Sequence, residues 1–223
     1  MTIAKLDPRT VPVTRVDRHL PAVHPAVLHP DALRSRFAAP PAWQAEYLLE
    51  KKFMDRAPMP AAVLLPIVLR PEPTVLLTLR TQHLSTHSGQ ISFPGGKVDD
   101  TDTDAVAAAL REAQEEIGLA APFVEVLGQL PVYVTGSAFH VTPVVALISP
   151  DMILCPNPFE VADVFEVPLA YLMNPAHHRH HRATWQGVQR EWLSMLYHDA
   201  TTERFIWGAT AGMLRNFYRF LQA

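Results

Sequence analysis

The sequence predicts an α/β (α+β) domain in which a mixed β-sheet is sandwiched between helices. Two apolar runs of strand length, AAVLLPIVL and TVLLTLR, are separated by the turn-rich segment RPEPT. A strongly helical segment, DAVAAALREAQEEIG at 104–118, comes next, and further strand-like runs and an apolar-striped helix complete the chain. Strands, a helix, more strands and a final helix are typical of helices that cover a mixed sheet.

The composition is typical of a soluble globular protein. Hydrophobic residues make up 48% and charged residues 18% of the 223 residues, enough to form a substantial core. The net charge of −3 gives no electrostatic reason to expect nucleic acid or a membrane as a partner. Cys155 is the only cysteine, which excludes an internal disulfide, and the start MTIAKLDPRT does not resemble a signal peptide. We therefore expect a cytoplasmic protein.

Residues 1–58 are predicted to form an N-terminal extension with short helices, ahead of one domain over 59–223. The segment HPDALRSRFAA at 29–39 predicts a helix capped by Asp31. A second helix is expected in PAWQAEYLLEKKF at 41–53. The residues before these helices are rich in proline and histidine, and we expect them to wrap around the domain or to be partly disordered.

Apolar runs, turn residues and helical periodicity define the elements of the domain. Asp102, Thr103 or Asp104 can cap the start of the 104–118 helix, and Gly118 stands where a helix-ending glycine is expected. Strands are expected at 61–69, 74–80, 90–96, 123–134, 140–148 and 159–172, a late hairpin at 187–198 and 202–208, and a last helix at 209–223.

Three carboxylates lie near the end of the 104–118 helix, where the helix dipole disfavours negative charge. Glu112 and Glu116 share one face with Glu115 beside them, and Arg111 is placed to pair with Glu115. A divalent cation would relieve the repulsion, because Mg²⁺ binds carboxylates together with waters and phosphate oxygens. A solvated acidic face is the alternative. The glycine turn and acidic loop just upstream favour a metal site for a phosphate-bearing substrate.

The stretch from Gly96 through REAQEEIGL at 111–119 resembles the signature of the Nudix hydrolases. The likeness covers a glycine, a spaced acid, and then Arg-Glu-x-x-Glu-Glu-x-Gly followed by an apolar residue. The spacing from Gly96 to Arg111 is one residue longer than usual, so the upstream acid is best supplied by Asp102 or Asp99. Ala113 stands where a larger aliphatic residue is common.

The residues before this signature resemble an element of the coenzyme A pyrophosphatase branch, in which the longer spacing is usual. Thr81 stands at its small position, and Ser85 replaces the arginine that the branch usually has. RFIWGATAGML at 204–214 also resembles the branch, whereas the N-terminal extension is not covered. The residues that match in place are Leu76, Leu77, Thr78, Arg80, Gly89, Phe93, Pro94, Gly95 and Gly96.

The resemblance implies a Nudix fold and a diphosphatase that uses Mg²⁺ or Mn²⁺. It implies Glu112 and Glu116 as metal ligands, with Glu115 as a ligand or as the base that positions water. Arg111 would hold Glu115, and the glycine turn would add a backbone carbonyl ligand at Gly96. The candidates for substrate binding are Arg80, Phe93, Gly95 and Gly96.

Arg80 ends a predicted strand and is equally compatible with a phosphate contact and with a surface position. His83 and His87 flank the same loop and could bind a phosphate or a base. The simpler interpretation is that each is a polar loop histidine without a functional role.

The substrate implied is coenzyme A or an acyl-coenzyme A, cleaved to 3′,5′-ADP and 4′-phosphopantetheine. Another dinucleotide such as ADP-ribose or NADH, or a catalytically silent domain that binds a nucleotide and regulates a partner, stays open. By analogy with other Nudix domains we expect a homodimer.

Other conspicuous features favour plainer interpretations. HHRHH at 177–181 predicts a solvated loop rather than a metal site. Cys155 lies between proline turns and predicts an incidental thiol. Glu160 and Glu166 are expected to be strand-edge carboxylates rather than additional acids of the site. The aromatic residues expected in the core are Trp192, Phe205, Trp207, Phe217 and Phe220.

Overall fold

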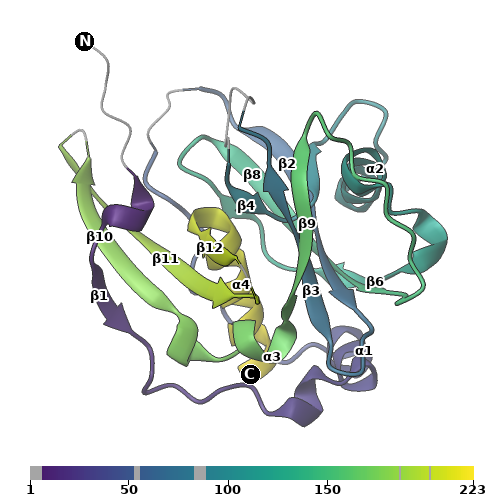
Figure 1. Cartoon of the computed structure of the whole chain (residues 1–223), viewed down its shortest axis with the longest axis horizontal. Coiled ribbons are helices and arrows are strands. Elements are labelled where there is room, and N and C mark those ends of the chain that lie inside the picture. Colours follow the sequence, from purple (N-terminus) through teal and green to yellow (C-terminus); the bar gives the residue numbers. More distant parts are fainter. Residues whose placement is uncertain (1–6, 53–55, 83–88, 186, 201) are drawn as a thin grey trace.

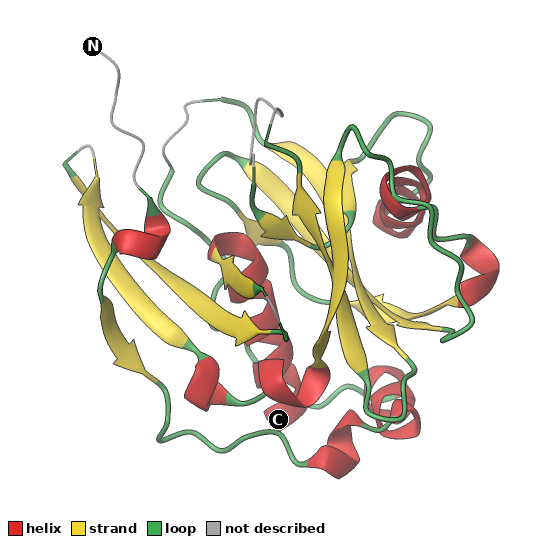
Figure 2. Ribbon diagram, viewed as in Figure 1, coloured by secondary structure: helices red, strands yellow, loops and turns green. Residues whose placement is uncertain are grey.

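The computed structural model describes residues 7–52, 56–82, 89–185, 187–200 and 202–223. Within them, an eight-stranded mixed sheet and a four-stranded antiparallel sheet lie on either side of the C-terminal helix α4 (Gly208–Gln222) (Figure 1). Helix α2 (Ala105–Ile117) covers the other face of the larger sheet. The predicted mixed sheet between helices is therefore confirmed, and Figure 2 shows how the strands and helices alternate in layers.

The larger sheet has the strand order β4-β3-β2-β8-β6. Strand β2 (Met59–Val68) pairs in parallel with β8 (Phe139–Ile148) along its whole length, and antiparallel with β3 (Thr74–Arg80). The strands predicted at 61–69 and 74–80 are confirmed. Central strands covered on both faces read as nearly continuous apolar runs rather than alternating ones, which explains AAVLLPIVL. The remaining strands of this sheet are β4 (Ile91–Ser92), β5 (Gly95–Lys97), β6 (Val124–Gln129), β7 (Tyr133–Val134) and β9 (Val161–Pro168).

Alternate residues of β2 point into two separate cores. Ala62 and Leu64 belong to the smaller cluster, which includes the small buried residues of α2 such as Ala109. Leu65 and Ile67 belong to the larger cluster, which includes the apolar face of α4. The large sheet thus fixes α2 on one side and the second sheet with α4 on the other.

Helix α2 begins and ends as the sequence predicts. The Asp104 carboxylate accepts the Ala107 N–H at 2.8 Å, so of the three candidate caps Asp104 is the one used. Gly118 follows the helix in the left-handed region, with φ of 70°, where glycine carries little steric cost. These two caps set the register that places Glu112 and Glu116 opposite β5.

The second sheet contains strands β1 (Val13–Val16), β10 (Arg179–Trp185), β11 (Val188–His198) and β12 (Glu203–Trp207), in that order. The predicted β11–β12 hairpin is confirmed, but the solvated loop predicted at 177–181 is wrong. His178 and His181 are buried, and β10 begins inside the histidine run. The His181 ring lies 2.9 Å from the Val11 carbonyl and 2.7 Å from Ser194 Oγ, so both nitrogens have partners that make burial possible.

Helix α1 (Pro30–Ala38) occupies the predicted place, but its predicted cap is wrong. His29 is the N-cap residue and makes no side-chain cap bond. Asp31 is the second residue of the helix, where it pairs with Arg34 at 2.7 Å and complements the positive end of the helix dipole. Short helical turns occur at α3 (Leu169–Leu172) and, as 3₁₀ turns, at Pro8–Thr10, Pro25–Leu28, Ala121–Phe123 and Pro175–His177.

The second helix predicted at 41–53 is absent from 41–52, the part of it that the structure describes. The Glu46 and Tyr47 N–H groups both donate to Asn216 Oδ1 of α4, at 3.0 and 2.9 Å. Leu49 forms an isolated bridge with Val134. These tertiary partners satisfy backbone groups that a helix would otherwise pair, so packing overrides local propensity.

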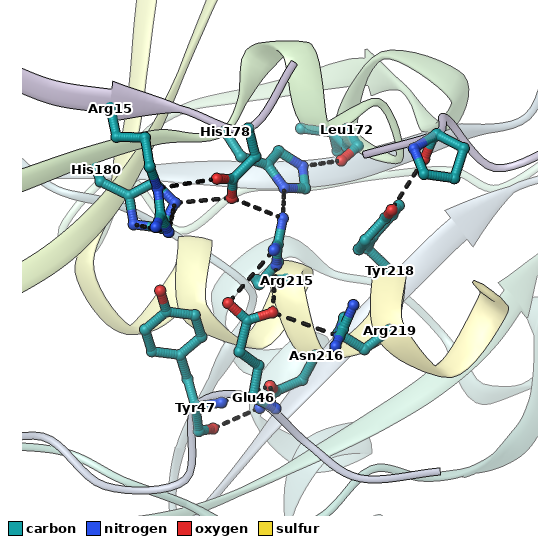
Figure 3. Close-up of polar contacts among 12 residues, drawn as sticks. Arg15, Glu46, Tyr47, Leu172, His178, His180, Arg215, Asn216, Tyr218 and Arg219 are labelled. Atoms are coloured by element: carbon teal, nitrogen blue, oxygen red, sulfur yellow. Dashed lines mark hydrogen bonds and ion pairs between the residues drawn. The ribbon is translucent and has the colours of Figure 1, made fainter. Parts of the chain in front are cut away.

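A buried polar network ties the N-terminal segment to α4 and β10 (Figure 3). Arg215 pairs with Asp17 at 3.1 Å and with Glu46 at 2.8 Å, and donates to His178 Nδ1 at 3.0 Å. Asp17 also accepts from His180 at 2.7 Å. Burial works against ionisation of Asp17, but His180 and the two nearby arginines outweigh it and hold its pKa below the usual range. In the described residues no helix combines the length and the apolar character needed to cross a membrane.

Candidate active site

The glutamates near the end of α2, Glu112, Glu115 and Glu116, lie close to the turn that joins β4 to β5 and to the end of β3. Glu116 is the most buried of them, with 3% of its side chain exposed. Its Oε2 accepts the Gly95 N–H at 3.1 Å, and its Oε1 accepts Arg80 Nη1 at 3.0 Å. Burial raises the pKa of Glu116 to about 7, with the Glu112 and Glu160 charges adding to the rise and Arg80 opposing it.

Glu112 lies one turn earlier on the same face of α2, directly against Gly96. A Cβ at Gly96 would lie 2.4 Å from Glu112 Oε1 and 2.5 Å from its Cδ, so only glycine leaves room for this carboxylate. Partial burial raises the pKa of Glu112, although Arg111 opposes the rise. The Glu112 side chain of α2 therefore packs directly against Gly96 in the glycine turn.

Arg111 is the centre of the charged cluster. It donates to both oxygens of Asp102 at 3.0 and 2.9 Å, and to the Lys97 carbonyl at 3.0 Å. Its Nη1 reaches Glu112 at 3.0 Å and Glu115 at 3.1 Å, so the predicted Arg111–Glu115 pair is confirmed. The additional contact to Glu112 relieves part of the repulsion that the three carboxylates would otherwise create.

Of the two candidates for the upstream acid, the geometry favours Asp102. Its side chain is 5% exposed and bound bidentately by Arg111, whereas Asp99 is 61% exposed and lies 3.7 Å from the same guanidinium. The hydrogen bonds from Arg111 lower the pKa of Asp102. Glu115 lies at the rim of the cluster, with 56% of its side chain exposed.

The upstream residues approach the acids from β3 and β5. Gly95 has φ of 155°, and a Cβ there would lie 2.4 Å from the Ala62 carbonyl oxygen, so this position also requires glycine. Phe93 is 2% exposed and belongs to the larger core, where it supports the turn from beneath. Its substrate-binding role stays a prediction, and His83, Ser85 and His87 lie outside the described residues.

The two later glutamates differ from each other. Glu166 is a strand carboxylate that pairs with Arg70 at 2.7 Å and accepts the Thr74 hydroxyl, away from the site. Glu160 immediately precedes β9, and its charge contributes to the raised pKa of both Glu112 and Glu116, so it lies near the acid cluster. For Glu160 this differs from the plain strand-edge carboxylate that the sequence favoured, because its placement depends on how the β8–β9 connection folds back onto α2.

The donor chemistry of this cluster fits a hard divalent cation. In the described part of the chain no three His, Cys, Asp or Glu side chains are already gathered in a metal-binding arrangement. Glu112 and Glu116 nevertheless bring oxygen donors to the same face of α2, and burial disfavours the ionised form of each. A cation bound between them would offset that cost, since a nearby positive charge favours the ionised carboxylate.

Comparison with known proteins identifies the same segment. The NUDIX domain family matches residues 58–188. Proteins described as uncharacterized Nudix hydrolase NudL from Escherichia fergusonii and from Escherichia coli strain K12 are 47% and 46% identical over 156 residues, which cover 70% of this chain and 79% of each relative. Among solved structures, a Nudix hydrolase from M. smegmatis, RenU, is 26% identical with a TM-score of 0.44, covering 51% of this chain and 73% of that one.

Proposed function

The chain belongs to the Nudix family of hydrolases, and we propose that within it this protein cleaves the diphosphate linkage of coenzyme A or acyl-coenzyme A. The products would be 3′,5′-ADP and 4′-phosphopantetheine or its acyl form. The observation that supports this substrate is the Leu76–Gly96 element, whose residues Arg80, Gly95 and Gly96 all contact the acids of α2. The residues that resemble the coenzyme A branch thus lie against the acids that we propose as the reacting site.

We infer that Glu112 and Glu116 hold Mg²⁺ or Mn²⁺, with Glu115 and the Gly96 carbonyl as further candidate ligands. The bound cation would neutralise the diphosphate and lower the pKa of an attacking water. Arg111 orients this set, because its guanidinium is hydrogen-bonded to Asp102, Glu112 and Glu115.

Arg80 is the residue best placed to contact a substrate phosphate. It ends β3 beside Glu116, and its Nε is buried without a hydrogen-bond partner. A guanidinium suits phosphate oxygens, and the Arg80 side chain is 20% exposed, so its accessible N–H groups can serve a substrate oxygen while Nη1 stays on Glu116. In hydrolysis, water forms the new P–O bond, its proton passes to a carboxylate such as Glu115, and the bridging oxygen leaves with the other phosphate.

The test is product analysis after incubation with coenzyme A and Mn²⁺, by liquid chromatography and mass spectrometry. Release of 3′,5′-ADP and 4′-phosphopantetheine is expected. Glu116→Gln should abolish metal-dependent turnover while leaving the fold intact, and near-normal activity would contradict the assigned metal site.

Two alternatives are separated by the same panel. Preferential cleavage of ADP-ribose or NADH would indicate a Nudix enzyme for another nucleoside diphosphate derivative. Binding without turnover of any substrate would indicate a silent regulatory domain. The retention of Arg111 with all three glutamates favours an active enzyme, because binding alone does not need the full set.

We also propose a homodimer that works in the cytoplasm. Light scattering of the purified chain measures its mass directly, and a mass near the monomer value of 24.9 kDa would exclude the dimer.

A further inference from the structure

The connection between β8 and β9 is fastened to the last turn of α2. The Asn157 N–H donates to the Glu116 carbonyl at 2.9 Å, and the Cys155 N–H donates to the Ile117 carbonyl at 2.9 Å. In Figure 1 this connection runs beside α2 before it enters β9. It is therefore held in a fixed position relative to the acid cluster.

The last residues of the connection are fixed a second time, by the end of β3. The Thr81 N–H donates to the Glu160 carbonyl at 3.0 Å, and the Thr81 hydroxyl donates to the Phe159 carbonyl at 3.0 Å. Asn157 Oδ1 accepts the Phe159 N–H at 3.1 Å. Both backbone polar groups of Phe159 thus have partners.

The Phe159 ring is held outward at this fixed point, with 75% of the residue exposed. Single exposed apolar residues are common, so the exposure of Phe159 alone does not indicate a role. Its position beside the acid cluster is what suggests one. The next residue, Glu160, acts electrostatically on Glu112 and Glu116. Arg80, which precedes Thr81, donates to Glu116. The backbone of Phe159 is therefore held beside the site proposed to contain the diphosphate, and its ring is exposed there.

We propose that Phe159 is the stacking platform for the base of the substrate's nucleoside half, and that it sets the preference for adenine nucleotides over compounds without a base. This inference rests on the proposed cleavage of a nucleoside diphosphate derivative. A base is joined to the diphosphate through its ribose, so a flat ring exposed beside the phosphate site lies where a base can reach it. An aromatic face stacks on a base without needing hydrogen-bond donors.

The chain supplies a matched control in the same connection. Ile153 is 76% exposed, so it equals Phe159 in exposure but offers no aromatic face. Ile153→Ala and Phe159→Ala each remove an exposed apolar side chain from one loop. Phe159→Trp keeps a stacking surface and serves as the conservative variant.

Isothermal titration with Mg²⁺ tests the proposal with three probes, namely 3′,5′-ADP, AMP and inorganic pyrophosphate. Phe159→Ala should weaken binding of the better adenine nucleotide by about 5- to 150-fold, the range known for loss of one stacked base. Binding of pyrophosphate, which has no base, should stay within twofold. Ile153→Ala and Phe159→Trp should match the wild type with all probes.

Three results would overturn the proposal. These are unchanged nucleotide affinity in Phe159→Ala, an equal loss of pyrophosphate binding, and failure of the wild type to bind either adenine nucleotide. Turnover of coenzyme A is measured separately, so a wild type that binds nucleotides through Phe159 but does not cleave coenzyme A would contradict only the proposed substrate. With a substrate that is cleaved, Phe159→Ala should raise KM and leave kcat unchanged.

Discussion

Replacing Gly96 by alanine should inactivate the enzyme without unfolding it. The new Cβ would lie 2.4 to 2.6 Å from three atoms of the Glu112 carboxyl group. Gly96 has no positive φ, so its backbone accepts alanine without strain. The atoms that must move belong to the end of a flexible side chain, and the cost to folding is therefore small.

The expected loss of activity follows from the size of the displacement. Ordinary van der Waals contact begins at 3.4 Å, so the carboxylate must retreat by about 1 Å from its place at 2.4 Å. A misplacement of about 1 Å in a catalytic group can cost about 100-fold in rate, which corresponds to about 2.7 kcal/mol. Movement of Glu112 also disturbs the 3.0 Å contact with Arg111, which positions the other acids.

The assay pairs metal-dependent turnover with thermal unfolding, and Gly95→Ala is the contrasting variant. At Gly95 a Cβ would meet the Ala62 carbonyl oxygen at 2.4 Å, and φ of 155° disfavours any side chain. Gly95→Ala should therefore lower Tm, whereas Gly96→Ala should keep a near-normal Tm and lose metal affinity and activity. A Gly96→Ala enzyme with activity within twofold of wild type would refute the placement of Glu112 in the site.

Other predictions concern stability. Arg215→Met removes one of three partners of the buried Asp17 carboxylate and leaves His180 and Arg15 in contact with it, so unfolding in urea should show a loss of up to about 3 kcal/mol, the low end of the range for a broken buried pair; an unchanged midpoint would contradict this role. Asp104→Ala removes the α2 cap and should cost about 1 kcal/mol, whereas Asp104→Asn should stay near wild type. The Glu116 pKa of about 7 lies above its ordinary value of 4.5, so the folded state holds this proton more tightly and loses stability as pH rises from 4.5 through 7. In EDTA at pH 8, the free energy of unfolding of Glu116→Gln should exceed that of the wild type by up to about 3 kcal/mol. Mg²⁺ should reduce this difference, and equal Tm values in EDTA would contradict the cost of the buried charge.

Elements with a strong local signal could be predicted from the sequence. The long apolar strands, α2 with its Asp104 and Gly118 caps, and the late hairpin need no distant partner to be recognised, because apolar period and cap chemistry define them. The Arg111–Glu115 pair follows equally from helix spacing.

Features that depend on distant segments could not be predicted. The segment around Tyr47 has helical composition, but Asn216, far along the chain, captures its backbone N–H groups. His181 lies in a polar run that is typical of a solvated loop, but Ser194 and strand β1, both distant in the sequence, lie beside it and bury it. Glu160 lies near the acids only because the β8–β9 connection is bound to the end of α2.

The acids at the end of α2 are tolerated because both sources of repulsion are reduced before any cation binds. The negative end of a helix dipole consists of unpaired carbonyls, and here the Glu116 and Ile117 carbonyls accept N–H groups from the β8–β9 connection. The side-chain charges are only partly balanced. Three glutamates and Asp102 contribute four negative charges when all are ionised, Glu160 and Asp99 add two more, and Arg80 and Arg111 contribute two positive ones, leaving −6 + 2 = −4. A divalent cation would reduce this remaining negative charge, so the fold holds these carboxylates in place while leaving the charge that a metal ion needs.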